Sequence, residues 1–92
     1  MTNVDKIIFT MDGLKDYIYW QTEDKRTLKK INNLINDIIR NGNKGVGHPE
    51  ELKGNLSGKW SRKIDDKNRL VYQIFEDGKV EIYQCRGHYD DR

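Results

Sequence analysis

RLVYQIFEDGKVEIYQCR, residues 69–86, is the stretch of this chain that decides its fold. Two runs of alternating apolar residues flank Asp77-Gly78, a dipeptide typical of two-residue hairpin turns. A third run precedes them across a turn-rich segment. The runs are KWSRKI (59–64), RLVYQIF (69–75) and KVEIYQCR (79–86). They predict an antiparallel meander of three strands.

The alternation within 69–75 sorts its side chains onto two faces. Leu70, Tyr72 and Ile74 share one face, and Arg69 lies on the other. An antiparallel sheet commonly packs one face on the core and leaves the other solvated. We therefore expect the apolar set to meet helices and Arg69 to look outward, which makes the outward face the candidate site.

Upstream of these runs, the sequence predicts a short strand at 6–9 and then a helix. Thr10 is a suitable N-terminal cap, and the helix should end near Gln21. Its expected buried face carries Leu14, Tyr17 and Ile18, widened by Tyr19 and Trp20.

A second helix is predicted from Asp24 to Asn41. Its apolar residues recur at steps of three and four, the pattern of an amphipathic helix. They are Leu28, Ile31, Leu34, Ile35, Ile38 and Ile39. Residues 42–58 follow with five of the eight glycines and the single proline, so no long regular element is expected there.

Length and composition indicate one small polar domain over residues 1–92. The chain is 35% apolar and 35% charged, and a core of this size favours an open surface site over a deep pocket. The sequence has neither a membrane-spanning apolar run nor a signal-peptide pattern, so a cytoplasmic protein is expected. The lone Cys85 and the separated His48 and His88 lack zinc spacing, and no metal or cofactor is expected.

Positive charge is concentrated in residues 53–69. This stretch contains six cationic and two acidic side chains, so its net charge is +4. The whole chain has a net charge of +2, so the other residues sum to −2. The cations are Lys53, Lys59, Arg62, Lys63, Lys67 and Arg69. Such a cluster fits contact with a phosphate backbone and equally fits a solvated protein face.

Three side-chain types in the chain suit RNA cleavage. Attack of a 2′-hydroxyl on the adjacent phosphate needs a base, a cation for the developing charge and an acid for the departing 5′-oxygen. Glu50, Arg69 or Lys63, and His88 can fill these roles. Each also has an ordinary interpretation: Glu50 as a surface acid, Arg69 as a partner of the acidic turn, and His88 as a solvated residue near the C-terminus.

Taken in order, these residues resemble a known family. The resembling stretches are YIYWQTEDKRTLKKINNLINDI (17–38), GHPEELKGNLSGKWSRKIDDKNRLVYQI (47–74) and QCRGHY (84–89). They are similar to the YoeB/Txe branch of the RelE superfamily of bacterial toxins, over almost the whole chain. The resemblance implies an α+β, microbial-ribonuclease-like fold, with two N-terminal helices packed on a twisted antiparallel sheet that includes a short N-terminal strand. It also implies a ribosome-dependent endoribonuclease that cuts mRNA in the A site without a metal ion.

The family's motifs assign roles by position. Glu50 falls on the general base, Arg69 on the phosphate stabiliser, His88 on the general acid, and Tyr89 on a residue that orients substrate or shares proton transfer. Only the motif register favours Glu50 over Glu51 as the base. The residues implied to bind RNA are Lys53, Lys59, Arg62 and Lys63. Lys63 replaces an arginine common in relatives and so loses the bidentate fork.

The chain departs from the family pattern at two places. Asn68 precedes Arg69 at the position where the family's strand motif has histidine. Asp90, Asp91 and Arg92 extend the chain beyond the terminal His-Tyr pair. We expect the two added carboxylates to favour the protonated imidazole of His88.

The resemblance implies a cognate YefM/Axe-like antitoxin, the ribosome and mRNA as partners. A homodimer is also expected, supported by apolar helix faces around Trp20 and its neighbouring tyrosines. Two other functions stay open: a catalytically silent co-repressor that binds the ribosome or an antitoxin, and, more weakly, a DNA-binding protein.

Overall fold

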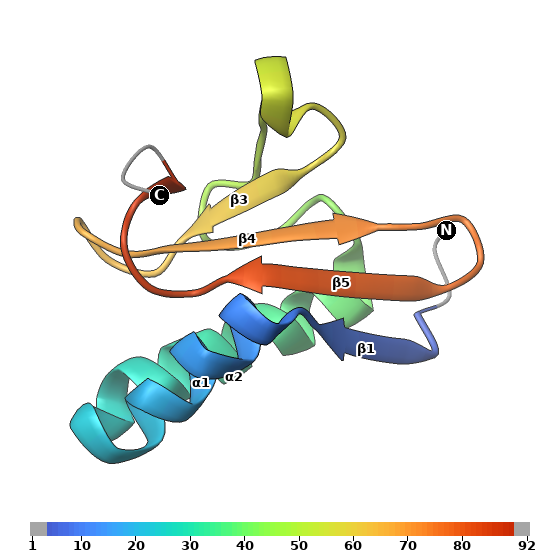
Figure 1. Cartoon of the computed structure of the whole chain (residues 1–92). Coiled ribbons are helices and arrows are strands. Elements are labelled where there is room, and N and C mark those ends of the chain that lie inside the picture. Colours follow the sequence, from blue (N-terminus) through green and yellow to red (C-terminus); the bar gives the residue numbers. More distant parts are fainter. Residues whose placement is uncertain (1–3, 90–92) are drawn as a thin grey trace.

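A computed structural model describes residues 4–89 of the chain. Within this range, two helices pack side by side on one face of a five-stranded sheet (Figure 1). The elements in chain order are β1 (Lys6–Phe9), α1 (Met11–Glu23), α2 (Lys25–Asn41), β2 (Glu50–Glu51), the 3-10 helix η1 (Gly54–Leu56), β3 (Trp60–Lys63), β4 (Arg69–Ile74) and β5 (Lys79–Gln84). The α+β class predicted from the sequence is confirmed.

The sheet has the strand order β1-β5-β4-β3-β2. The three predicted runs form the antiparallel meander β3-β4-β5, and β2 extends it by two residues. The N-terminal strand β1 runs parallel to β5, so the sheet is mixed, while its other pairings are antiparallel as expected. The sequence signals that fix strand direction are hairpin turns, and β1 reaches β5 through no such turn.

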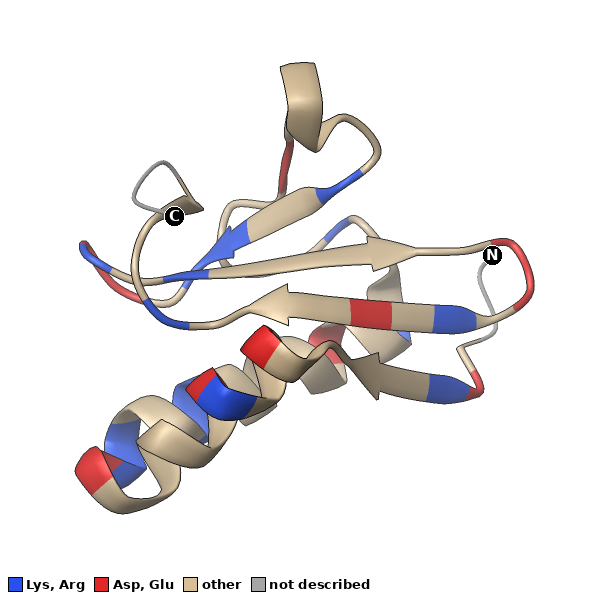
Figure 2. Ribbon diagram, in the orientation of Figure 1, with Lys and Arg blue, Asp and Glu red and all other residues tan. Residues whose placement is uncertain are grey.

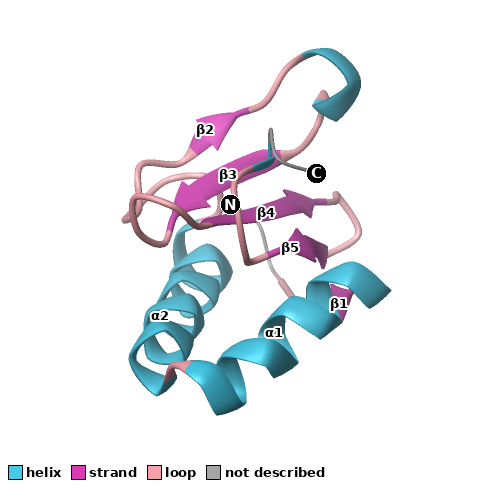
Figure 3. Ribbon diagram, turned by 60° about the vertical axis from the view of Figure 1, so that its left-hand side comes forward, coloured by secondary structure: helices cyan, strands magenta, loops and turns pink. Residues whose placement is uncertain are grey.

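The core lies between the sheet and the helices (Figure 3). Helix α2 is capped by Asp24, the first residue of the predicted helix, whose carboxylate accepts hydrogen bonds from the amides of Arg26 and Thr27. Its apolar stripe packs into the core with residues of β4 and β5 as predicted, except that Ile39 is exposed. The most buried apolar residues of this core include Ile31, Leu34, Ile38, Leu70, Tyr72, Val80 and Ile82. Neither helix among residues 4–89 has the length and apolar character needed to cross a membrane.

Helix α1 presents a different face to the sheet than the sequence predicts. Leu14 and Ile18 are 37% and 51% exposed, whereas Gly13, Asp16 and Trp20 are buried. The end of β5 sets this rotation: Asp16 Oδ2 accepts the Cys85 amide at 3.1 Å, and Trp20 Nε1 donates to the Cys85 carbonyl at 2.8 Å. Trp20 is therefore a core residue, and the expectation that it supports a dimer surface is wrong.

The thirteenth residue is glycine because α1 touches the β5 backbone there. A Cβ at Gly13 would overlap the carbonyl oxygen of Ile82, and the carbonyl carbons of Ile82 and Tyr83 lie only 3.1 and 3.3 Å from that position. The amide of Thr10 donates to the same Ile82 carbonyl at 3.0 Å. This contact fixes the path of the chain toward its C-terminal residues.

Candidate active site

The face of the sheet away from the helices, called the outer face below, collects the predicted catalytic residues. Directly paired residues of neighbouring strands share a face. Glu50 pairs with Ser61 and Ser61 with Val71, while Lys63 pairs with Arg69. Leu70 and Tyr72 face the core, so these alternate residues face outward.

The register separates the two candidate bases. Glu51 pairs with Trp60, which packs against the core, so Glu51 lies on the opposite face from Glu50. Two strand spacings, about 10 Å, lie between the Cα atoms of Glu50 and Val71. The long side chains of Glu50 and Arg69 can therefore approach one phosphodiester from two sides.

The C-terminal segment is held beside the start of β4 at Gly87. The Gly87 amide donates to Asn68 Oδ1 at 2.7 Å. The Gly87 carbonyl accepts the Arg69 amide and Gln84 Nε2, both at 3.0 Å. His88 follows directly and is half-buried, with its ring 4.2 Å from the ring of Tyr89. The segment after β5 thus turns toward the side of the sheet opposite the helices (Figure 1).

The turn between β3 and β4 orients the arginine. Arg69 Nη1 donates to the backbone carbonyls of Asp65 at 2.6 Å and Asn68 at 3.2 Å. The expected partner of Arg69 was an acidic side chain of this turn, and the bonds go to carbonyl oxygens instead. The Asp65 carboxylate accepts bonds from Asn68 and from the Lys67 amide. Burial raises the pKa of Asp65, but these bonds outweigh it, and the net pKa lies below its ordinary value.

Lys53, Lys59 and Lys63, three of the four basic residues predicted to bind RNA, differ in their surroundings from the fourth, Arg62. Lys53 and Lys63 are exposed, and Lys63 forms an ion pair with Asp66 at 3.1 Å. Lys59 Nζ stands 4.2 Å from the ring centre of Tyr83 on β5. Figure 2 shows basic segments at both ends of β3 and at the start of β4. These cations flank the residues that the register brings to the outer face.

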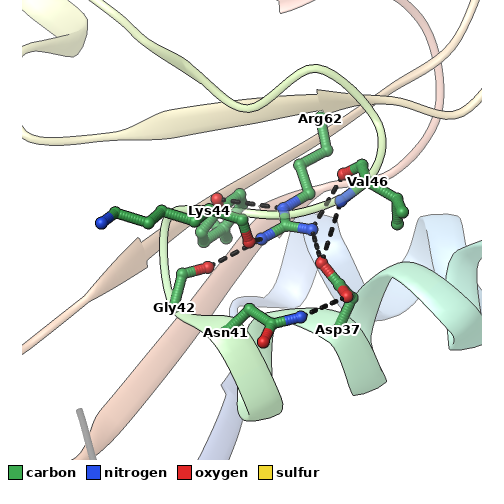
Figure 4. Close-up of polar contacts among 7 residues, drawn as sticks. Asp37, Asn41, Gly42, Lys44, Val46 and Arg62 are labelled. Carbon is green, nitrogen blue, oxygen red and sulfur yellow. Dashed lines mark hydrogen bonds and ion pairs between the residues drawn. The ribbon is translucent and has the colours of Figure 1, made fainter. Parts of the chain in front are cut away.

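Arg62 differs, and the prediction that it binds RNA is wrong. Its side chain is fully buried on the helix side of β3, where it forms an ion pair with Asp37 of α2 (Figure 4). The guanidinium of Arg62 lowers the pKa of Asp37 below its ordinary value. Arg62 also donates to three backbone carbonyls of the glycine-rich loop and, through Nε, to the Tyr72 hydroxyl. Arg62 therefore holds the protein together internally and is not available to a phosphate backbone.

Comparison with known proteins identifies the family. A family model described as a YoeB-like toxin of a bacterial type II toxin-antitoxin system matches residues 9–89. The chain belongs to this family. It is 54% identical over 84 residues to Toxin YoeB of Streptomyces coelicolor, covering 91% of this chain and 99% of that protein.

Solved structures agree with this assignment. The YoeB dimer from Staphylococcus aureus is 43% identical, with a TM-score of 0.86 over 96% of this chain and 100% of that one. The toxin in the heterotetrameric YoeB-YefM complex from Staphylococcus aureus is 44% identical, with a TM-score of 0.85 over 94% of this chain and 98% of that one.

Two residues that sequence reasoning missed hold the site of this YoeB-like toxin together. Asn68, noted only as a departure from the family pattern, links the β3–β4 turn to Gly87. Gln84, on the outer face beside Val71, binds the carbonyls of Arg86 and Gly87. An asparagine within an Asp-rich turn predicts a local hydrogen bond, but its partner at residue 87 is 19 residues away in sequence.

The family model also ends at Tyr89, so the added tail lies beyond the matched region. The expectation that Asp90 and Asp91 favour the protonated His88 concerns residues outside the described range. Within residues 4–89, no group of three or more His, Cys, Asp or Glu side chains could hold a metal ion.

Proposed function

We propose that this YoeB-like toxin is a ribosome-dependent endoribonuclease that cleaves mRNA in the A site by acid and base catalysis. The observation that carries the proposal is the tie at Gly87. Its bonds to Arg69, Asn68 and Gln84 hold Gly87 beside the start of β4, which supports a position for His88 near Glu50 and Arg69.

The proposed chemistry assigns one role to each of three groups. Glu50 takes the proton of the 2′-hydroxyl as the oxygen attacks the adjacent phosphorus. Arg69 neutralises the charge that develops on the pentavalent phosphate. His88 gives a proton to the departing 5′-oxygen, which leaves a 2′,3′-cyclic phosphate and a 5′-hydroxyl. Tyr89, stacked near His88, orients the substrate.

The site is open, which fits a substrate held by the ribosome. Glu50 and Lys53 are exposed, and Arg69 and His88 are half-buried, which fits groups on an open sheet face. An open site on a small domain supplies little orientation by itself. The ribosome would then provide the alignment that brings the 2′-hydroxyl in line with the scissile bond.

Cleavage on programmed ribosomes tests the proposal. Toxin is mixed with ribosomes that carry an mRNA with a defined A-site codon, and cut positions are mapped by primer extension. The paired variants Glu50→Gln and Glu51→Gln remove one charge each from neighbouring residues on opposite faces. Glu50→Gln should lower the single-turnover rate by about 10²–10⁴-fold, whereas Glu51→Gln should stay near wild type.

Ribosome binding separates the enzyme from the silent co-repressor. We expect Glu50→Gln and His88→Asn to bind ribosomes as the wild type does while cleavage is lost. Translation arrest by both variants at wild-type strength would instead favour the co-repressor. Equal cutting of the same RNA with and without ribosomes would contradict ribosome dependence.

The proposed partners follow from charge and from the relatives. The cationic outer face suits an acidic, partly disordered antitoxin segment that orders on binding, and a YefM/Axe-like antitoxin is the proposed partner because a YoeB-YefM complex is known from Staphylococcus aureus. A homodimer is proposed by analogy with the YoeB dimer. We place the toxin in the cytoplasm, where ribosomes translate mRNA.

A further inference from the structure

We propose that the ion pair between Arg62 and Asp37 positions Glu50, acting through the backbone of the loop at residues 42–47. The inference rests on the proposed role of Glu50 as general base. The guanidinium of Arg62 donates hydrogen bonds to the backbone carbonyls of three alternate residues of this loop (Figure 4). Nη2 donates to Gly42 at 2.7 Å and to Lys44 at 2.9 Å, and Nη1 donates to Val46 at 2.9 Å.

Asp37 holds the same loop from the helix side. Its carboxylate accepts the Val46 amide at 3.1 Å and Asn41 Nδ2 at 2.7 Å, in addition to Arg62. Both backbone polar groups of Val46 are thus bound to the ion pair. Glycine-rich backbone has many accessible conformations, and these bonds favour the one observed.

The loop leads directly to Glu50. The Gly47 carbonyl accepts the Lys63 amide of β3 at 2.7 Å, three residues before Glu50. On the other side, the Leu52 amide donates to the Lys59 carbonyl at 2.9 Å. Glu50 therefore lies between two attachments to β3. If the loop is released, the segment on the N-terminal side of Glu50 loses its support from Arg62 and Asp37, and Glu50 keeps its pairing with Ser61 of β3.

The chemistry of arginine explains why this position is not lysine. A guanidinium offers five donors in a fixed plane, and the loop, Asp37 and Tyr72 use donors on all three of its nitrogens. An ammonium keeps the charge but offers three donors from one nitrogen. Displacement of a catalytic group by about 1 Å costs on the order of 10²-fold in rate. Arg62→Lys should therefore loosen the loop and slow cleavage.

Two variants disturb the loop in different ways. Arg62→Lys changes the clamp itself. Gly45→Ala keeps both residues of the ion pair but introduces a Cβ that would overlap the Asp37 carboxylate, at a residue with φ of +122°, so the carboxylate or the loop must shift. Ile31→Ala is the matched control, because it removes buried volume from α2 at an apolar side chain that makes none of the hydrogen bonds holding the loop.

Each full-length variant is assayed for ribosome affinity, single-turnover cleavage and amide hydrogen exchange below its unfolding temperature. We expect Arg62→Lys and Gly45→Ala to speed exchange at Val46 by tenfold or more and to slow cleavage by about 10²-fold at unchanged ribosome affinity. Ile31→Ala should lower the unfolding temperature and leave the cleavage rate of the folded toxin unchanged.

Three results would overturn the inference: wild-type cleavage by both loop variants despite faster exchange at Val46, wild-type exchange at Val46 in both loop variants, or an equal loss of cleavage in Ile31→Ala. Failure of the proposed function looks different. In that case Glu50→Gln itself cleaves as the wild type does, while exchange at Val46 still responds to the loop variants.

Discussion

Replacing Gly13 with alanine tests how α1 is seated on the end of β5. On an ordinary helix the change stabilises by up to about 1 kcal/mol, because glycine has the lower helix propensity. Here the added Cβ would overlap the Ile82 carbonyl oxygen, and the other near atoms belong to the β5 backbone, which cannot rotate away. Helix α1 must therefore move.

The cost of that movement can be estimated from the contacts involved. Overpacking of this kind costs about 1–3 kcal/mol. The hydrogen bonds from Thr10 to Ile82 and from Trp20 to Cys85 are weakened as well, each worth about 1 kcal/mol. Set against the propensity gain, Gly13→Ala should lower the free energy of unfolding by about 2–4 kcal/mol.

Urea unfolding followed by tryptophan fluorescence and circular dichroism measures this loss, with an unchanged m-value as the sign that compactness is preserved. Asn33→Ala, at an exposed position of α2, is the control and should gain a few tenths of a kcal/mol, about the difference in helix propensity. A Gly13→Ala protein as stable as the wild type, or more stable, would refute the described seating of α1.

Three further predictions concern charge and positioning. Arg62 lowers the pKa of Asp37, so the folded state binds fewer protons than the unfolded state in acid. The stability that this pair contributes should be full above about pH 4 and should fall as the pH drops through the lowered pKa. Urea titrations should show a smaller loss of stability in acid for Asp37→Asn. Asn68→Ala removes the acceptor of the Gly87 amide and should slow single-turnover cleavage about tenfold at unchanged ribosome affinity, with Lys67→Ala as control. Lys63→Arg restores a bidentate fork and should raise affinity for mRNA-loaded ribosomes severalfold in equilibrium binding, and equal affinities would contradict a role for Lys63 at phosphate.

The sheet and α2 could be predicted because local pattern and tertiary environment agree there. The hairpin dipeptide at 77–78 and the alternation of 69–75 define β4 and β5, and the three- and four-residue steps define α2. The direction of β1 could not be predicted, since its pairing with β5 joins residues more than seventy positions apart.

Helix α1 shows where pattern fails. Its apolar residues predict one buried face, but polar bonds to Cys85 and the close approach at Gly13 rotate the helix so that Ile18 is exposed. Hydrophobic periodicity carries no information about a partner backbone across 69 residues of sequence.

The inward position of Arg62, in contrast, could be predicted from the sequence. Trp60, Arg62 and Ile64 alternate along one strand, so the core-facing position of its neighbours already places Arg62 inward. The net charge of residues 53–69 does not distinguish Arg62 from Lys63, whereas the alternation of side chains along the strand puts them on opposite faces.

A structure of the toxin on a ribosome whose A-site mRNA carries a 2′-O-methyl group, which blocks the attacking oxygen, tests the proposed convergence most directly. The expected result is one scissile phosphodiester on the outer face, with Glu50 near the modified oxygen, Arg69 on the phosphate and His88 near the 5′-oxygen. An mRNA bound against the helices, or a phosphate out of reach of any of the three groups, would contradict it.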